Sequence, residues 1–141
     1  MPQYTTEYRD AWVLGQVEAY AELVQCGKPA ACLMVPRGTL RLAVVVAHQR
    51  GCRVYAELLP EARDWTVLWV YRTRLILRVI KALPAAREHF PHDVLCWYEG
   101  NLFGYPLGEI AAATLAERSA SSKCLPGGKP RREAWFRPCS Q

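Results

Sequence analysis

The stretch Thr66-Val67-Leu68-Trp69-Val70-Tyr71 decides the fold, because it is the apolar run whose residue types most favour an extended backbone. Val, Trp and Tyr are enriched in β-strands, so we expect a strand here with Trp69 in the core. A second strand of the same kind is predicted at Cys52–Leu58. The polar segment Pro60–Asp64 between the two suits a hairpin or a tight connection.

Working outward toward the amino end, a third strand is predicted at Ala30–Val35, an apolar run bounded by two prolines. Between this strand and Cys52–Leu58, Thr39 can cap a helix over Leu40–Gln49, although the run Val44–Val46 would also suit a strand. Ahead of them all, apolar residues at helical spacing predict a helix that Gly27 and Pro29 end. These spaced residues are Val13, Val17, Tyr20 and Val24.

Toward the carboxyl end, the hydrophobic period becomes that of a helix from Thr73 onward. Prolines and glycines divide this half of the chain into short pieces. The predicted pieces are a helix stopped by Pro84, a short helical segment Ala85–Phe90, a helix from Pro91 to about Trp97, a loop over Glu99–Tyr105 and a last helix Leu107–Arg118. The expected fold class is therefore α/β or α+β, with a small three-stranded sheet covered by about five helices.

Length and composition indicate one globular unit. The chain has 141 residues, of which 51% are hydrophobic and 22% charged, and this excludes wholesale disorder, collagen and coiled coil. Residues 1–117 carry twelve basic and twelve acidic side chains, so the whole net charge of +5 lies in residues 118–141. We expect a single domain over 1–118 and a basic, disordered tail over 119–141 that could bind nucleic acid weakly.

The amino end lacks the basic start and apolar stretch of an export signal. Apolar runs such as Leu42–Ala47 are far shorter than the ~20 residues that a membrane span needs. These features predict a cytoplasmic protein that does not bind membranes. Six cysteines are an even number, but in a reducing compartment they are better interpreted as small apolar residues than as disulfides.

Few residues offer metal or nucleophilic chemistry. On one continuous helix, His89, His92 and Cys96 would share a face with ligands suited to zinc, iron or haem. Pro91 predicts a break between two helices there, so we predict no metal site and regard His89 and Cys96 as structural. Cys26, Cys32 or Cys96 could be nucleophiles beside His92 or His48, but no local signature supports this, and core thiols are the preferred interpretation.

Three further features could bind a ligand. Arg37-Gly38-Thr39 places a glycine turn, a cation and a hydroxyl at a predicted helix amino end, which suits an anion. Glu99, in the predicted loop, is an exposed carboxylate candidate. The aromatic residues Trp97 and Tyr98, followed by Gly104-Tyr105-Pro106, could form the wall of a cleft or an interface.

Four short motifs in one order resemble an uncharacterised family of short bacterial proteins, common in anaerobic Firmicutes, with the approximate pattern KPAS…VYR…FPHEIGxFLGYPLEDV. The resemblance covers roughly residues 20–117, but this chain has Asp93 in place of the glutamate and the longer segment Leu95–Asn101. It implies a shared site without naming an activity or a cofactor. The matching motifs are Lys28-Pro29-Ala30-Ala31, Trp69-Val70-Tyr71-Arg72, Phe90-Pro91-His92-Asp93 and Gly104-Tyr105-Pro106-Leu107-Gly108-Glu109-Ile110.

The first functional hypothesis is a bacterial accessory or regulatory protein that binds a small anionic ligand, or a protein partner, at a cationic cleft. The candidate binding residues are Lys28, Arg37, Tyr71, Arg72 and Tyr105, joined by His92. A second hypothesis is an enzyme with His92 as general acid or base and Asp93 assisting it. A third is a nucleic-acid-associated protein that uses the aromatic pair Trp135-Phe136 in its basic tail.

All hypotheses about the cleft depend on one expectation about where the side chains meet in the fold. Ligand sites in α/β layers lie beyond the carboxyl ends of strands, here at Pro36–Thr39 and Tyr71–Thr73. We expect the basic and imidazole side chains to meet there. The alternative is that Arg72 and Asp93 form a salt bridge that ties a strand to a helix.

Overall fold

The computed structural model describes residues 6–123, which form a three-stranded sheet and five α-helices. The expected fold class is therefore confirmed. A 3₁₀ turn over Arg37–Thr39 leads from the first strand into the second helix. The elements are α1 (Thr6–Gln25), β1 (Ala30–Pro36), α2 (Leu40–Gln49), β2 (Arg53–Leu58), β3 (Trp65–Tyr71), α3 (Arg74–His89), α4 (His92–Phe103) and α5 (Leu107–Lys123).

The strand predicted around Trp69 is the centre of the sheet. The strand order is β1-β3-β2, and β3 is antiparallel to both neighbours. Because Ala30 pairs with Tyr71 and Pro36 with Trp65, the carboxyl ends of β1 and β3 lie at opposite ends of the sheet. The expectation that the two strand ends meet at one site is therefore wrong. They are separated by the length of a seven-residue strand, about 20 Å.

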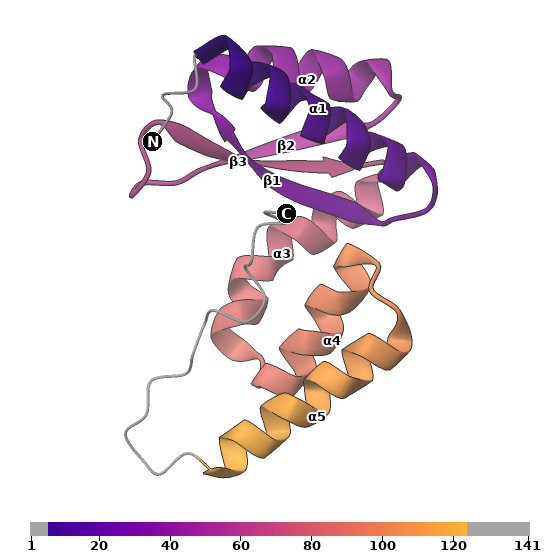
Figure 1. The fold of residues 1–141 in the computed structure, drawn as a ribbon. Helices are drawn as coiled ribbons and strands as arrows, with labels where there is room; N and C mark the ends of the chain where they lie inside the picture. The colour runs from indigo at the N-terminus through magenta and orange to yellow at the C-terminus, as the bar shows by residue number, and fades with distance from the viewer. Residues whose placement is uncertain (1–5, 124–141) are drawn as a thin grey trace.

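Helices cover both faces of the sheet, as Figure 1 shows, with α1 and α2 side by side on one face and α3 and α4 against the other. Successive side chains of β3 point to opposite faces of the sheet. Leu68 and Val70 pack in the core beneath α1 and α2. Trp69 and Tyr71 pack in the second core beneath α3 and α4.

The prediction that Pro84 stops a helix is wrong, because α3 continues through Pro84 to His89. Proline in a helix interior removes one hydrogen bond and strains the preceding turn. Leu83 and Ala86, on either side of it, are buried, whereas Pro84 itself is exposed. Burial of the neighbouring apolar residues outweighs the local preference of proline.

The loop predicted over Glu99–Tyr105 is also wrong, since α4 continues to Phe103 and ends at Gly104, which has a φ of 71°. Gly100 is inside the helix because α5 passes close to it. A Cβ at position 100 would lie 2.7 Å from Cγ1 of Ile110. The glycine therefore allows two helices to approach, and it does not mark a turn.

The last helix extends beyond the predicted Arg118 to Lys123, so the first residues of the predicted disordered tail, 119–123, are helical. The rest of the predicted tail, including Trp135-Phe136, lies outside the described residues. Within residues 6–123, no helix combines the length and the hydrophobicity needed to cross a membrane.

Gly100→Ala tests the approach of α4 and α5. Alanine is the better helix former by about 1 kcal/mol, but its methyl group would force the fully buried, β-branched Ile110 to shift. Overpacking of this kind costs roughly 1–3 kcal/mol. We therefore expect a net loss of about 1 kcal/mol in the free energy of unfolding, measured by urea denaturation.

Gly108→Ala is the matched control, because nothing lies within 4 Å of a Cβ built at that position of α5. It should leave stability unchanged or raise it slightly. A Gly100→Ala variant as stable as the Gly108→Ala variant would contradict the close packing of α4 on α5.

A candidate apolar pocket between α3 and α4

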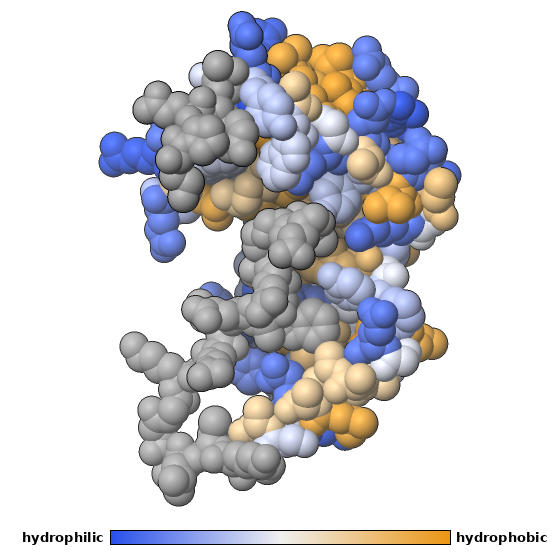
Figure 2. Space-filling view, viewed as in Figure 1, coloured by the Kyte–Doolittle hydropathy of each residue, from blue (hydrophilic) through white to orange (hydrophobic). Residues whose placement is uncertain are grey.

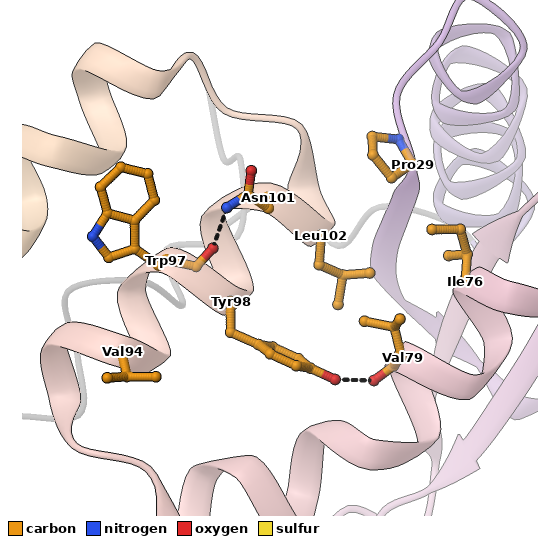
Figure 3. Close-up of a pocket in the computed structure, with 8 residues that line it drawn as sticks. All are labelled: Pro29, Ile76, Val79, Val94, Trp97, Tyr98, Asn101 and Leu102. Carbon is orange, nitrogen blue, oxygen red and sulfur yellow. Dashed lines mark hydrogen bonds between the residues drawn. The ribbon is translucent and has the colours of Figure 1, made fainter.

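An open hollow lies between α3 and α4 and has a volume of about 450 Å³ (Figure 3). Its wall is almost entirely apolar. Its volume falls in the range of small-molecule sites, and its mouth is open to solvent. The residues that line it are Pro29, Ile76, Val79, Val94, Trp97, Tyr98, Asn101 and Leu102.

The hydroxyl of Tyr98 and the amide of Asn101 in this wall are already hydrogen-bonded within the protein. The Tyr98 hydroxyl donates to the carbonyl oxygen of Val79 at 2.7 Å, and burial raises the pKa of this phenol. The side-chain amide of Asn101 donates to the carbonyl oxygen of Trp97 at 2.7 Å. Figure 3 shows both bonds lying along the wall. The pocket therefore presents a mostly apolar contact surface to the hydrophobic part of a ligand.

One end of the pocket adjoins basic groups. In Figure 3, Pro29 and Ile76 lie together at one end, away from Val94 and Trp97. Lys28 directly precedes Pro29, while Ile76 belongs to the first turn of α3, whose amino end carries partial positive charge. Arg72 and Arg74 flank the capping residue Thr73 at that same helix start. Basic residues from two segments are therefore next in sequence to the Pro29 end, although none of them is among the residues that line the pocket.

These basic side chains are not neutralised within the described part of the chain. None of residues 6–120 forms an ion pair with Lys28, Arg72 or Arg74. The nearby carboxylates of Glu18 and Glu22 pair with Arg50 instead. Lys28 lies over the ring of Tyr20 at 5.8 Å, and the guanidinium of Arg72 donates to the carbonyl oxygen of Gln25 at 3.5 Å.

The structure brings three of the predicted binding residues, Lys28, Arg72 and Tyr105, to one end of the sheet. The pairing of Ala30 with Tyr71 places the segment before β1 beside the end of β3. A Cβ at Gly104 would lie 2.9 Å from Pro29 and 3.6 Å from the Lys28 side chain, so the end of α4 meets the same corner. Tyr105 is the next residue in the chain, and the centroid of its ring lies 6.3 Å from the centroid of the Phe103 ring.

His92 and Asp93 lie elsewhere, at the opposite end of α4 from Gly104. A helix of 12 residues is about 18 Å long, so the predicted convergence of the imidazole with Lys28 and Arg72 is wrong. The Asp93 carboxylate accepts from Arg118 at 3.1 Å, which holds its pKa below the usual value. Asp93 therefore forms its salt bridge with Arg118 of α5, and the alternative prediction of an Arg72–Asp93 salt bridge is wrong. Among the contacts that the structure describes, none joins Asp93 to His92.

Two other predicted ligand contacts do not contribute an exposed side chain to this corner, Arg37 because of its position and Tyr71 because of its burial. Arg37 lies at the far end of the sheet, and its neighbour Thr39 is buried with its hydroxyl donating to Asp10 of α1 at 2.7 Å. Asp10 thereby brings a carboxylate to the amino end of α2, where an anionic ligand was expected. Tyr71 is 5% exposed and belongs to the core beneath α3 and α4.

The three residues considered for a metal site belong to different helices or surfaces. His89 is exposed at the end of α3, His92 is exposed at the start of α4, and Cys96 is buried. Among the residues that the structure describes, no group of three or more candidate ligands is arranged to hold a metal ion.

Glu99, expected to be exposed, is buried and bound to Arg87 at 2.9 Å. This reversal follows from the helix in place of the predicted loop. Nearby, burial raises the pKa of the Cys32 thiol to about 12, and the Glu57 carboxylate adds to the effect. Desolvation also raises the pKa of Cys52. Both thiols are therefore poor nucleophiles, as expected of core cysteines.

Sequence patterns reveal only part of the pocket. The aromatic wall at Trp97 and Tyr98 is predicted, whereas Ile76, Val79 and Leu102 are indistinguishable from ordinary helix or loop residues. The spacing of Val94, Trp97 and Asn101 is that of one helix face. This signal would reveal the pocket if Gly100 were accepted within a helix.

Comparison with models of known families, with curated proteins and with solved structures finds no match for this chain.

The raised pKa of Cys32 predicts low reactivity. A thiol with a pKa of about 12 is ionised to roughly one part in ten thousand at pH 8. We expect iodoacetamide to label the exposed Cys26 before Cys32, as measured by mass spectrometry of peptides from briefly treated native protein. Labelling of Cys32 at the rate of Cys26 in the folded protein would contradict the burial that raises its pKa.

Proposed function

We propose that this protein is a small accessory or regulatory protein that binds an amphipathic anion, a ligand with a hydrophobic body and one acidic group. The body would occupy the pocket between α3 and α4. The acidic group would lie at the Pro29 end, near Lys28, Arg72 and Arg74. The observation that carries the proposal is an apolar pocket whose Pro29 end is next in sequence to basic residues that form no ion pair with a described carboxylate.

Hydrophobic burial would supply most of the affinity. Removing apolar surface from water contributes about 25 cal/mol per Å², whereas an exposed ion pair contributes about 1 kcal/mol or less. The basic end would therefore orient the ligand and select for negative charge. The amino end of α3 adds to the same field, because its first N–H groups point out of the helix.

Binding is favoured over catalysis because the described groups around the pocket lack a positioned acid, base or nucleophile. Tyr98 and Asn101 are tied to backbone carbonyls, and His92 is at the distant end of α4. An enzyme would need a titratable side chain within reach of the bound ligand. The bacterial origin and cytoplasmic location suggested by the sequence fit an intracellular carrier or sensor.

The proposal is tested with decanoate as the probe, titrated into the full chain by isothermal calorimetry. Decanoate should bind saturably, and decanol, which has the same tail without the charge, should bind about fivefold more weakly. Lys28→Gln combined with Arg74→Gln should remove this preference for the acid. Trp97→Ala, which shortens the apolar wall, should weaken both probes about tenfold.

Matched controls separate the pocket from general surface effects. Arg41→Gln removes one positive charge from α2, on the other face of the sheet, and Trp12→Ala removes an exposed aromatic ring from α1. Neither change should alter binding. The proposed function would be refuted if neither probe bound saturably. It would also be refuted if the control variants lost as much affinity as the pocket variants.

A further inference from the structure

β2 forms an open edge of the sheet. It pairs with β3 on one side, and no strand among the described residues pairs with its other side. The six residues of β2 match β3 one to one, so the strand has no bulge, and it contains no proline. Proteins usually protect such edges, because unpaired N–H and C=O groups readily accept another strand.

The side chains of β2 suit pairing with a second copy of the same strand. In an antiparallel pair related by a two-fold axis, directly opposite residues lie on the same face of the joined sheet. When the axis passes through Tyr55, Arg53 lies opposite Glu57 of the second copy, and Glu57 opposite its Arg53. Both charges lie on the face that carries α3 and α4.

This register makes two opposite-charge contacts from one pair of residues. Cross-strand ion pairs contribute roughly 0.2–1 kcal/mol each, and like charges at the same positions are destabilising. Within the described chain, neither Arg53 nor Glu57 forms an ion pair. The alternative register centred on Ala56 would bring Tyr55 opposite Glu57 and leave both Arg53 side chains outside the pair.

We propose that β2 pairs with β2 of a second copy of this chain, in the register centred on Tyr55, to give a dimer with one continuous sheet. The remaining contact in this register is Val54 with Ala56, on the face that carries α1 and α2. The inference is independent of the pocket, because the pocket lies between α3 and α4 and involves none of these residues.

Sedimentation equilibrium of the full chain over a range of concentrations tests the dimer and its register. The natural sequence should dimerise. Arg53→Glu and Glu57→Arg should each weaken the dimer about tenfold, because each places like charges opposite one another twice. The double variant Arg53→Glu/Glu57→Arg restores opposite charges and should return the dissociation constant to within about twofold of the original.

Arg41→Glu is the control, since it makes the same change in net charge as Arg53→Glu but lies on α2. It should leave the dimer intact. A monomer at all concentrations would overturn the proposal, and so would a dimer that both single variants leave unchanged or that the double variant fails to restore. Circular dichroism of each variant should match that of the natural sequence, which checks that the variant is folded.

Engineered cysteines give a second measurement that does not depend on charge. Tyr55→Cys would place two Cα atoms about 5 Å apart across the axis, within disulfide range, whereas the two residues of Glu57→Cys would be roughly 13 Å apart along the strands. Under mild oxidation, the Tyr55→Cys variant should form a disulfide between the two engineered thiols of the dimer, identified by peptide mapping. Failure of this bond to form, or equal linkage through position 57, would overturn the register.

Discussion

Burial of β3 on both faces is the constraint on which the rest of this structure depends. Leu68 and Val70 are fully enclosed under α1 and α2, and Trp69 is 2% exposed on the opposite face. The outer surface of the part that holds α1 and α2 carries hydrophilic and hydrophobic residues interspersed (Figure 2). The Trp69 ring stacks on Phe103 at 5.6 Å, which ties the end of α4 to the middle of the sheet. Because α4 is fixed at Phe103 and α3 follows directly from β3, the space between these two helices has a defined shape.

The candidate pocket is a consequence of that arrangement. Its apolar wall consists of side chains of α3 and α4 together with Pro29, which lies near the place where β3 ends, β1 begins and α3 starts. Gly104 allows the chain after α4 to pass within van der Waals distance of Lys28 and Pro29. The closeness in the fold of the apolar pocket to the segments that carry Lys28 and Arg72 thus follows from the strand order.

The residues of the sheet are predictable from sequence because β-branched and aromatic residues bounded by prolines and glycines leave few other solutions. The strand order is predictable only in part: the segment Pro60–Asp64 favours pairing of Cys52–Leu58 with β3, whereas nothing in the composition of Ala30–Val35 indicates that it pairs with the other side of β3. For that reason sequence alone groups Arg37 with Arg72, although the sheet separates them. Local residue preferences carry little information about register between distant segments.

The helical half of the chain is harder to predict from sequence, for a different reason. The intrinsic preferences of Pro84 and Gly100 predict breaks, but tertiary contacts decide both positions. Burial of Leu83 and Ala86 carries α3 past the proline, and the proximity of Ile110 requires the glycine inside α4. The ion pair between Arg87 and Glu99 and the ion pair between Asp93 and Arg118 depend on these helices being continuous. Neither pairing can be inferred from sequence spacing alone.

The most direct test of the account is to locate a bound amphipathic anion on the protein. In a titration with decanoate, followed by ¹H–¹⁵N correlation spectra of the full chain, the backbone amides of Lys28, Ile76, Asn101 and Leu102 should shift together and saturate. The amides of α2, on the other face of the sheet, should remain in place. Saturable shifts confined to the amides of α1 and α2, with the α3 and α4 signals unmoved, would contradict binding in the pocket between α3 and α4.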